Sequence, residues 1–425
     1  MDTDRQTPRF GLRSGSGWAD PFGMYARLRR ESPVHHVSPG PTPADDYWVL
    51  TRYADVADAA TDPATFSSAA GLTVTYGELE AIGMVDNPPL VMQDPPVHTA
   101  FRSLVARGFT PRQVTSLEPQ VHEFVADRLD RLAEAVRGTD GPIDVVGELL
   151  KPLPSMIVAH YLGVPEADRT HFDEWTSAIV GAVGPTATTD STATDSTETD
   201  AEAVRASAGA ATGELLAYFA DLIARRRIEP GDDTVSALVA AGRADDDAGL
   251  VSILAFVFTM IAGGNDTTTG LLGGSLELLA AAPDQRARLV AEPDLIPDAL
   301  EELLRLTSPV QGLARTTTRP VAYPDVGVEI PAGVKVLLCY GAANRDPEVF
   351  GPDADALDIT RRPRRILTFG RGDHHCLGAA AARMAGRIAL TELLARFPDF
   401  DVDPDGIIWA AGNYVRRPAY VPFRP

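Results

Sequence analysis

One short segment combines glycines, histidines and a cysteine in a spacing that could bind a flat metal cofactor. It is Phe-Gly-Arg-Gly-Asp-His-His-Cys-Leu-Gly, residues 369–378. Its glycines permit tight turns and a close approach of the backbone to a planar ligand. Cys376 opens an expected helix, 377–397, where free N–H groups and the helix dipole favour a thiolate. The segment therefore suggests metal ligation by the cysteine sulfur.

Two other interpretations of this segment stay open. A lone cysteine in a glycine-rich loop is often a buried structural residue. A zinc site would use His374, His375 and Cys376, but zinc sites need spaced ligands and a second ligand pair elsewhere. The other histidines show no such pairing, which disfavours zinc.

A second group of candidate residues lies in the apolar segment that begins at residue 248. We expect one helix over about 248–280, with Gly-Gly-Asn-Asp-Thr-Thr, 263–268, in its middle. One face of that helix carries Phe256, Met260, Gly263, Gly264 and Thr267. Asp266 and Thr267 could act as general acid and base groups. The structural alternative is a kink at the glycines, with the threonine bonding its own backbone.

The chain resembles the cytochrome P-450 superfamily, and most closely its soluble bacterial members. All six fixed positions of the family's haem signature, Phe-Gly-x-Gly-x-His-x-Cys-x-Gly, match at Phe369, Gly370, Gly372, His374, Cys376 and Gly378. The resemblance implies that Phe369, His374 and Gly378 contact haem b (iron protoporphyrin IX). It also implies that Cys376 is the axial ligand, whose thiolate favours O–O cleavage.

The resemblance gives roles to residues outside this signature. It implies that Asp266 and Thr267 relay protons during oxygen activation. Glu302-Leu-Leu-Arg305 is similar to the family's Glu-x-x-Arg motif, which implies a buried ion pair that braces the cysteine loop. The family's usual third partner has no counterpart at Ala356, so the identity of that partner is open.

Three cationic residues are similar to those that bind the haem propionates in the family. His98 and Arg102 stand four residues apart on an expected helix, 97–108, and Arg315 lies in a later strand. Anionic propionates suit charge-assisted hydrogen bonds from such side chains. For any one of these residues alone, a solvated surface position is the alternative.

The family's substrate contacts also map onto this chain. They are Leu72, Met84, Met92, Phe256, Met260, Gly264, Val310, Gln311, Tyr414 and Val415. This lining is apolar, so we expect a lipophilic small molecule such as a terpenoid, steroid, fatty acid or polyketide; the alternative is that these residues belong to the core. A Thr- and Asp-rich segment, 185–200, falls where the family has a lid and predicts a mobile, hydrophilic loop.

A cluster of arginines stands out in a chain of formal net charge −21. It consists of Arg361, Arg362, Arg364, Arg365 and Arg371. We expect an acidic ferredoxin, reduced by an NAD(P)H-dependent reductase, to dock there through complementary charge. The alternative is local pairing of these arginines with Asp353, Asp355 and Asp358.

The pattern of elements predicts a mainly α protein with small β-sheets (α+β). The resemblance implies the cytochrome P-450 fold, with haem between the long central helix and the helix after the cysteine loop. We expect a flexible segment at 1–17 and a single domain over 18–425. Helices are predicted at 21–31, 53–60, 97–108, 111–137, 148–162, 166–183, 201–227, 248–280, 294–306 and 377–397, and strands at 47–51, within 314–340 and in a hairpin at 407–423.

Charge and hydropathy exclude several classes of protein. The acidic balance disfavours nucleic acid and anionic membranes as partners. The polar N-terminus resembles neither a signal peptide nor a membrane anchor, and the apolar run at 248–264 is shorter than the ~20 residues of a spanning helix. Two cysteines imply no disulfide framework. A cytoplasmic monomer is expected.

The resemblance implies a haem-thiolate monooxygenase that uses ferredoxin-derived electrons to hydroxylate its substrate. Within the same fold, an oxidative coupling, decarboxylating or peroxide-driven enzyme is an alternative; the acid–threonine pair, Asp266 and Thr267, counts against the peroxide-driven type. An alternative of another class is a haem-binding sensor or carrier without turnover.

Overall fold

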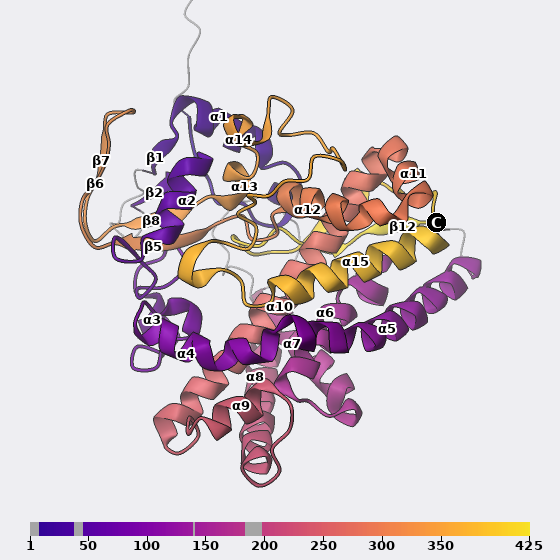
Figure 1. Cartoon of the computed structure of the whole chain (residues 1–425), viewed down its shortest axis with the longest axis horizontal. Helices are drawn as coiled ribbons and strands as arrows, with labels where there is room; N and C mark the ends of the chain where they lie inside the picture. The colour runs from indigo at the N-terminus through magenta and orange to yellow at the C-terminus, as the bar shows by residue number, and fades with distance from the viewer. Residues whose placement is uncertain (1–7, 38–45, 139–140, 183–197) are drawn as a thin grey trace, which may run out of the picture.

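The computed structural model describes residues 8–37, 46–138, 141–182 and 198–425. Helices dominate it (Figure 1). The α-helices are α1 (Phe22–Glu31), α2 (Tyr53–Thr61), α3 (Glu78–Ala81), α4 (Val97–Val105), α5 (Pro111–Arg137), α6 (Pro152–Leu162), α7 (Arg169–Ala182), α8 (Glu198–Ile228), α9 (Thr234–Ala240), α10 (Asp247–Ala281), α11 (Pro283–Ala291), α12 (Ile296–Thr307), α13 (Tyr340–Ala343), α14 (Pro347–Phe350) and α15 (Ala379–Arg396).

Short strands form small sheets beside the helices. The strands are β1 (Val34–Val37), β2 (Tyr47–Leu50), β3 (Phe66–Ser67), β4 (Ile143–Asp144), β5 (Leu313–Thr317), β6 (Val321–Tyr323), β7 (Val328–Ile330), β8 (Lys335–Leu338), β9 (Asp401–Val402), β10 (Ile408–Trp409), β11 (Pro418–Tyr420) and β12 (Pro422–Arg424). The largest sheet has the order β1-β2-β8-β5-β3, and within it only β2 and β8 pair in parallel.

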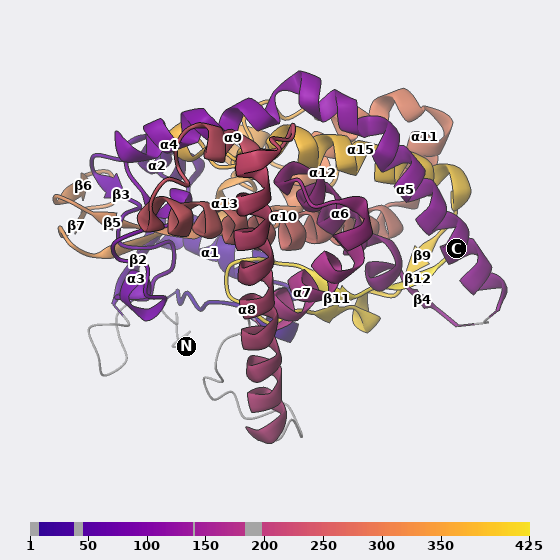
Figure 2. The same ribbon diagram turned by 90° about the horizontal axis from the view of Figure 1, so that it is seen from below.

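The long helix α10 organises the core, and Figure 2 shows α8 crossing it. Towards its C-terminus, Leu272 and Leu276 pack in a cluster shared with α5, α6, α12 and α15. Towards its N-terminus, Phe256 and Ile261 pack in a second cluster with α6, α8 and α9. Between these buried stretches Gly263 is exposed, although the helix runs through the middle of the molecule. The helix is therefore accessible at this point rather than covered by a neighbouring element.

Most of the predicted elements are confirmed. The architecture is mainly α with small sheets, and the predicted helix 111–137 has Thr110 as its N-cap and Pro111 in its first turn. The long helix spans one residue more at each end than predicted, and β10 pairs with β11 in the expected C-terminal hairpin.

Some boundaries were wrong. The prediction missed α9 and α11, which are seven and nine residues long, because so few turns give little periodic signal. The helix predicted from residue 294 begins at Ile296, after a short 3-10 turn. The helix after the cysteine loop begins at Ala379 rather than at residue 377, because Gly378 is its N-cap.

The two segments predicted to be flexible fall partly outside the described residues. The lid prediction for 185–200 lies outside them up to residue 197, and its last three residues begin α8. Residues 1–7 of the predicted N-terminal segment also lie outside. Trp18 is buried, and its Nε1 donates to the carbonyl of Gly412 at 2.8 Å. The domain boundary at residue 18 stays a prediction.

By length and composition, α10 could cross a membrane. Its place in the fold gives another reason for its apolar sequence, because it contacts α6, α7, α8, α12 and α15.

Candidate active site

The cysteine loop is a tight turn that closes on its own backbone. Gly370 and Gly372 have φ of +67° and +71°, a conformation that favours glycine. A side chain at Gly372 would also lie 2.8 Å from the carbonyl oxygen of Ala60. The N–H of Cys376 donates to the carbonyl of Phe369 at 2.8 Å. The glycines thus allow the loop to fold back and present the cysteine.

The Cys376 side chain is accessible but lies deep within the fold. Burial raises the pKa of its thiol, while the N–H of Gly378 and the charges of Arg102 and Arg383 lower it. The cysteine does not open the helix as predicted, since α15 begins three residues later. The stabilisation of the thiolate that was predicted from the helix N-terminus is therefore supplied by the N–H of Gly378, which lies just before α15.

Cationic and imidazole side chains from separate elements gather beside this loop. The rings of His98 (α4) and His374 lie 4.2 Å apart between centroids. Burial, followed by the charges of Arg315 (β5), His98 and Arg102 (α4), lowers the pKa of His374 to about 3. The Nδ1 of His98 is buried without a hydrogen-bond partner. This concentration of positive charge and an unused polar atom fit an anionic ligand such as the carboxylates of haem.

The middle of α10 lies across from the cysteine loop. Leu377, beside Cys376, packs against the same apolar cluster as Phe256 and Met260 of α10. A methyl group at Gly263 would meet nothing within 4 Å. The shared apolar cluster therefore places the residue after Cys376 near the middle of this helix.

Asp266 and Thr267 are adjacent but have different neighbours. The Oγ1 of Thr267 donates to the carbonyl of Gly263 at 2.8 Å, as the structural alternative predicts. Asp266 forms an ion pair of 2.9 Å with the Nε of Arg417 and lines a pocket of about 330 Å³ with Lys151. Burial raises the pKa of Asp266, whereas Arg417 and Lys151 lower it.

Comparison with known proteins agrees with this geometry. The family model for cytochrome P-450 matches residues 21–409. The chain belongs to the cytochrome P-450 family. It is 59% identical to cytochrome P-450 130 of Mycobacterium tuberculosis over 99% of both chains, and 36% identical to vitamin D(3) 25-hydroxylase of Pseudonocardia autotrophica over 99% of this chain and 97% of that one.

A solved structure supports the same assignment. Mycobacterium marinum CYP268A2 in complex with pseudoionone matches with a TM-score of 0.81 and 30% identity, over 96% of both chains. The fold is that of the cytochrome P-450 family, and the protein is a P-450 monooxygenase.

Among the residues that the structure describes, no cluster of three or more His, Cys, Asp or Glu side chains could hold a metal ion, so the zinc alternative gains no support.

The brace expected of a P-450 at the Glu-x-x-Arg motif is complete. Glu302 and Arg305 are fully buried, and two of the Arg305 nitrogens donate to the carboxylate at 2.7 Å. The Nε of Arg361 donates to the same carboxylate at 3.0 Å and is the third partner that the sequence left open. Arg305 also donates to the carbonyls of Asn344 and Ala354, which ties α12 to the loops before the cysteine.

This brace corrects the prediction that Arg361 belongs to a docking surface. Its side chain is only 12% exposed and is shared between Glu302 and Asp353. The alternative of local pairing with Asp353 therefore holds for Arg361. The signal that could have revealed it was its place in the arginine run after the Asp-rich stretch, where a third partner was missing.

Three of the predicted substrate contacts pack against, or form hydrogen bonds with, other parts of the protein. A methyl group at Gly264 would lie 2.5 Å from Cγ2 of Val158, so this glycine packs against α6. Phe256 is 2% exposed and packs in the core against Phe101. The buried Gln311 amide donates to the carbonyls of Thr307 and Ser308. For Phe256 and Gln311 the interpretation as core residues fits better, because the interior absorbs their side chains.

The structure gathers other predicted contacts around the start of β5. The carbonyl of Leu72 accepts the N–H of Ala314, the N–H of Val74 donates to the hydroxyl of Tyr414 at 3.0 Å, and Val310 forms a β-bridge with Val415. Met84, Met92 and Met260 are half-buried. The substrate role of these residues stays a prediction.

Proposed function

We propose that the protein is a haem-thiolate monooxygenase in which Cys376 ligates the iron of haem b. The observation that carries this proposal is the placement of an accessible, deeply set thiol on a loop whose His374 lies beside His98, Arg102 and Arg315. His98 and the two arginines would hold the propionates. Phe369, His374 and Gly378 would lie against the haem through the loop that they form.

The haem, when bound, activates O2 for insertion of one oxygen atom into the substrate. The chain's own residues supply protons. The raised pKa of Asp266 favours a carboxyl that can hold and release a proton. Rotation of the Thr267 hydroxyl away from the Gly263 carbonyl would let its Oγ1 pass a proton into the central space.

The proposed substrate is a lipophilic small molecule of the terpenoid or steroid type, with fatty acids and polyketides as wider possibilities. The predicted contacts Met84, Met92 and Met260 are half-buried, and Val310 and Val415, which pair in a β-bridge, add further apolar side chains to the predicted lining. Methionine side chains adapt to ligands of varied shape. The similarity to a vitamin D(3) 25-hydroxylase and to CYP268A2 in complex with pseudoionone supports the same chemical class.

For electron supply we infer a ferredoxin and an NAD(P)H-dependent reductase, with the enzyme acting as a cytoplasmic monomer. The support is the exposed arginine patch beside the cysteine loop, which consists of Arg362, Arg364, Arg365 and Arg371. Acidic ferredoxins would be attracted to this patch from solution.

The test is turnover by the holoprotein with a surrogate ferredoxin, its reductase and NADPH, on a ligand chosen by a spectral-shift screen. Product that requires the ferredoxin supports the proposal. Turnover with hydrogen peroxide alone would favour the peroxide-driven alternative. A haem protein that binds ligands but turns over with neither would favour a sensor or carrier.

A further inference from the structure

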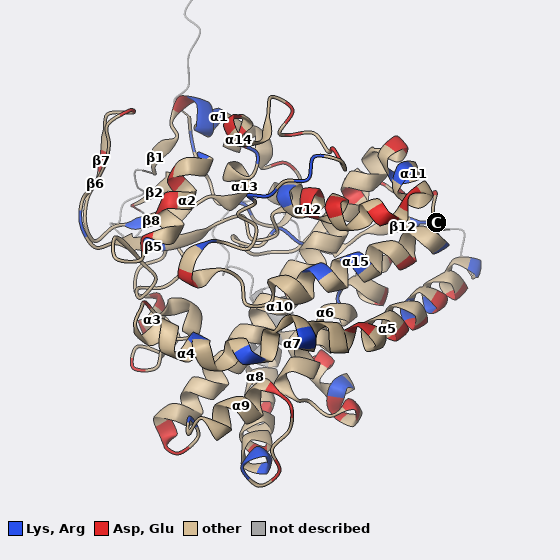
Figure 3. Cartoon of the chain, viewed as in Figure 1, with Lys and Arg blue, Asp and Glu red and all other residues tan. Residues whose placement is uncertain are grey.

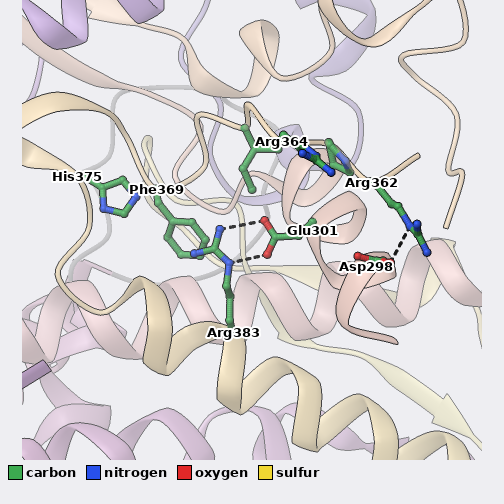
Figure 4. A pocket seen from close by; sticks show the side chains of 9 residues that line it. Asp298, Glu301, Arg362, Arg364, Phe369, His375 and Arg383 are labelled. Carbon is green, nitrogen blue, oxygen red and sulfur yellow. Dashed lines mark hydrogen bonds and ion pairs between the residues drawn. The ribbon is translucent and has the colours of Figure 1, made fainter. Parts of the chain in front are cut away.

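A surface pocket of about 490 Å³ lies against the cysteine loop, on the side of the basic patch. Its lining comprises Asp298, Glu301, Arg362, Pro363, Arg364, Ile366, Phe369, His375 and Arg383. Figure 4 shows the side chain of Arg383 between Phe369 and Glu301. This arrangement connects the cysteine loop to two helices, α12 and α15.

Arg383 is held in place from two directions. Its Nη2 lies 2.9 Å from Oε2 of Glu301, and its Nε bonds the other carboxylate oxygen. Its Cζ lies 4.5 Å from the centre of the Phe369 ring. A bidentate carboxylate and an aromatic face both suit the planar guanidinium and would be lost with most other side chains.

The contact with Phe369 bears on the cysteine itself. The carbonyl of Phe369 accepts the N–H of Cys376 at 2.8 Å, so the two residues close the loop together. Arg383 is also near enough to lower the pKa of the Cys376 thiol by its charge. The Glu301 carboxylate partly cancels that charge. Arg383 therefore acts on the cysteine loop in two ways. It packs against Phe369, and its charge, reduced by Glu301, acts on Cys376.

We propose that Arg383, oriented by Glu301, is a positioning residue that sets the reduction potential of the iron bound at Cys376. The proposal rests on Cys376 being the iron ligand. Reduction adds one electron to the metal–thiolate unit, and a nearby cation stabilises the added negative charge. Charge and hydrogen bonding around the ligand sulfur are established means of tuning such potentials. Arg383 should therefore raise the potential, and Glu301 should lower it.

The experiment is a spectroelectrochemical titration of purified holoprotein variants. Arg383→Gln should lower the midpoint potential, because the cation is gone. Glu301→Gln should raise it, because the cation loses its counter-charge while an amide can still accept its hydrogen bond. Arg383→Lys should lie nearer to the wild type than Arg383→Gln does. Arg387→Gln is the control, since Arg387 lies one turn further along α15 and pairs with Glu118 at 2.9 Å.

Shifts of opposite sign distinguish this electrostatic role from a structural one. If Arg383→Gln has the wild-type potential, or if both neutral variants shift in the same direction, the proposal is wrong. Should Arg383→Gln fail to retain haem, Glu301→Gln and Arg383→Lys carry the same test. A wild-type protein whose ferrous–CO spectrum lacks the thiolate form would instead overturn the assignment of Cys376.

Discussion

Thr267 and its neighbours show how single residues determine the chemistry of the site. In this structure its hydroxyl bonds the backbone of its own helix, and the proposed proton transfer requires that bond to be exchanged. The sequence predicted the Asp266–Thr267 pair. It did not predict Arg417, because an ion pair across 151 residues leaves no local signal.

We expect Thr267→Ala to uncouple reductant use from product formation. The variant should consume NADPH, but product per NADPH should fall about tenfold or more, in line with the loss of a proton-transfer group. The measurement compares NADPH oxidised with product formed. Thr259→Ala is the matched control, because Thr259 makes the same kind of bond, 2.8 Å to Ala255, elsewhere on α10. Equal uncoupling in both variants would contradict the assigned role.

We expect Arg417→Gln to change the pH dependence of turnover. Arg417 lowers the pKa of Asp266 against the effect of burial, so its loss should raise that pKa further. Asp266 should then stay protonated to higher pH, and the pH profile of product per NADPH should shift to higher pH. Lys151→Gln should give a smaller shift in the same direction, because Lys151 contributes less.

The raised pKa of Asp266 also determines how the free energy of unfolding changes with pH. A carboxyl whose pKa is raised on folding stabilises the fold most below its unfolded pKa, about 3.9, and less as pH rises through the folded pKa. Urea unfolding across this range should show a steeper loss for Arg417→Gln than for the wild type. An unchanged turnover profile together with unchanged unfolding would refute the coupling of Arg417 to Asp266.

At the scale of elements, the two adjacent glycines of α10 have different surroundings. Gly263 borders open space, whereas Gly264 allows α6 to approach through Val158. Sequence periodicity grouped both on one helical face, but adjacent residues of a helix point about 100° apart. Which neighbour each glycine meets depends on the packing of α6, which the sequence of α10 does not contain.

We therefore expect opposite results from two alanine substitutions. Gly264→Ala should destabilise the protein by about 1–3 kcal/mol through overpacking against Val158. Gly263→Ala should stabilise the helix by up to about 1 kcal/mol. Chemical denaturation measures both, and Val158→Ala should restore part of the loss in Gly264→Ala. Equal effects at the two positions would contradict the packing described.

The cysteine loop and the Glu-x-x-Arg motif were the elements most open to prediction. Their residues lie close in sequence, so the fixed spacing that the chemistry requires can be seen directly. Arg361 was assigned to the wrong role because its exposure depends on how the loop at 353–361 folds onto Glu302. The surroundings of Gly264, Phe256 and Gln311 are likewise set by the packing of other elements, and their substrate role stays a prediction.

On the scale of the whole molecule, charge is unevenly distributed. The chain is strongly acidic, yet Figure 3 shows a basic stretch of loop beside α12. Arg362 in this stretch pairs with Asp298, whereas Arg364 and Arg365 extend the exposed patch. The overall α-rich fold was predictable, because it follows from helical periodicity along most of the chain. Four of the five arginines named from the sequence are exposed, and their docking role stays a prediction.

We expect Arg364→Glu to slow reduction by an acidic ferredoxin about tenfold at low ionic strength, and less as salt screens the charges. Stopped-flow reduction at several salt concentrations measures this effect. Arg131→Glu is the control, because Arg131 is exposed on α5, away from the patch. A variant at Arg364 that is reduced as fast as the wild type at low salt would remove the docking proposal.

The ferrous–CO difference spectrum of the purified holoprotein, measured beside that of Cys376→Ala, tests whether Cys376 ligates the iron. We expect the thiolate-type Soret band in the wild type and its loss in Cys376→Ala. A wild-type protein without haem, or one whose spectrum shows another axial ligand and is unchanged by the substitution, would contradict it.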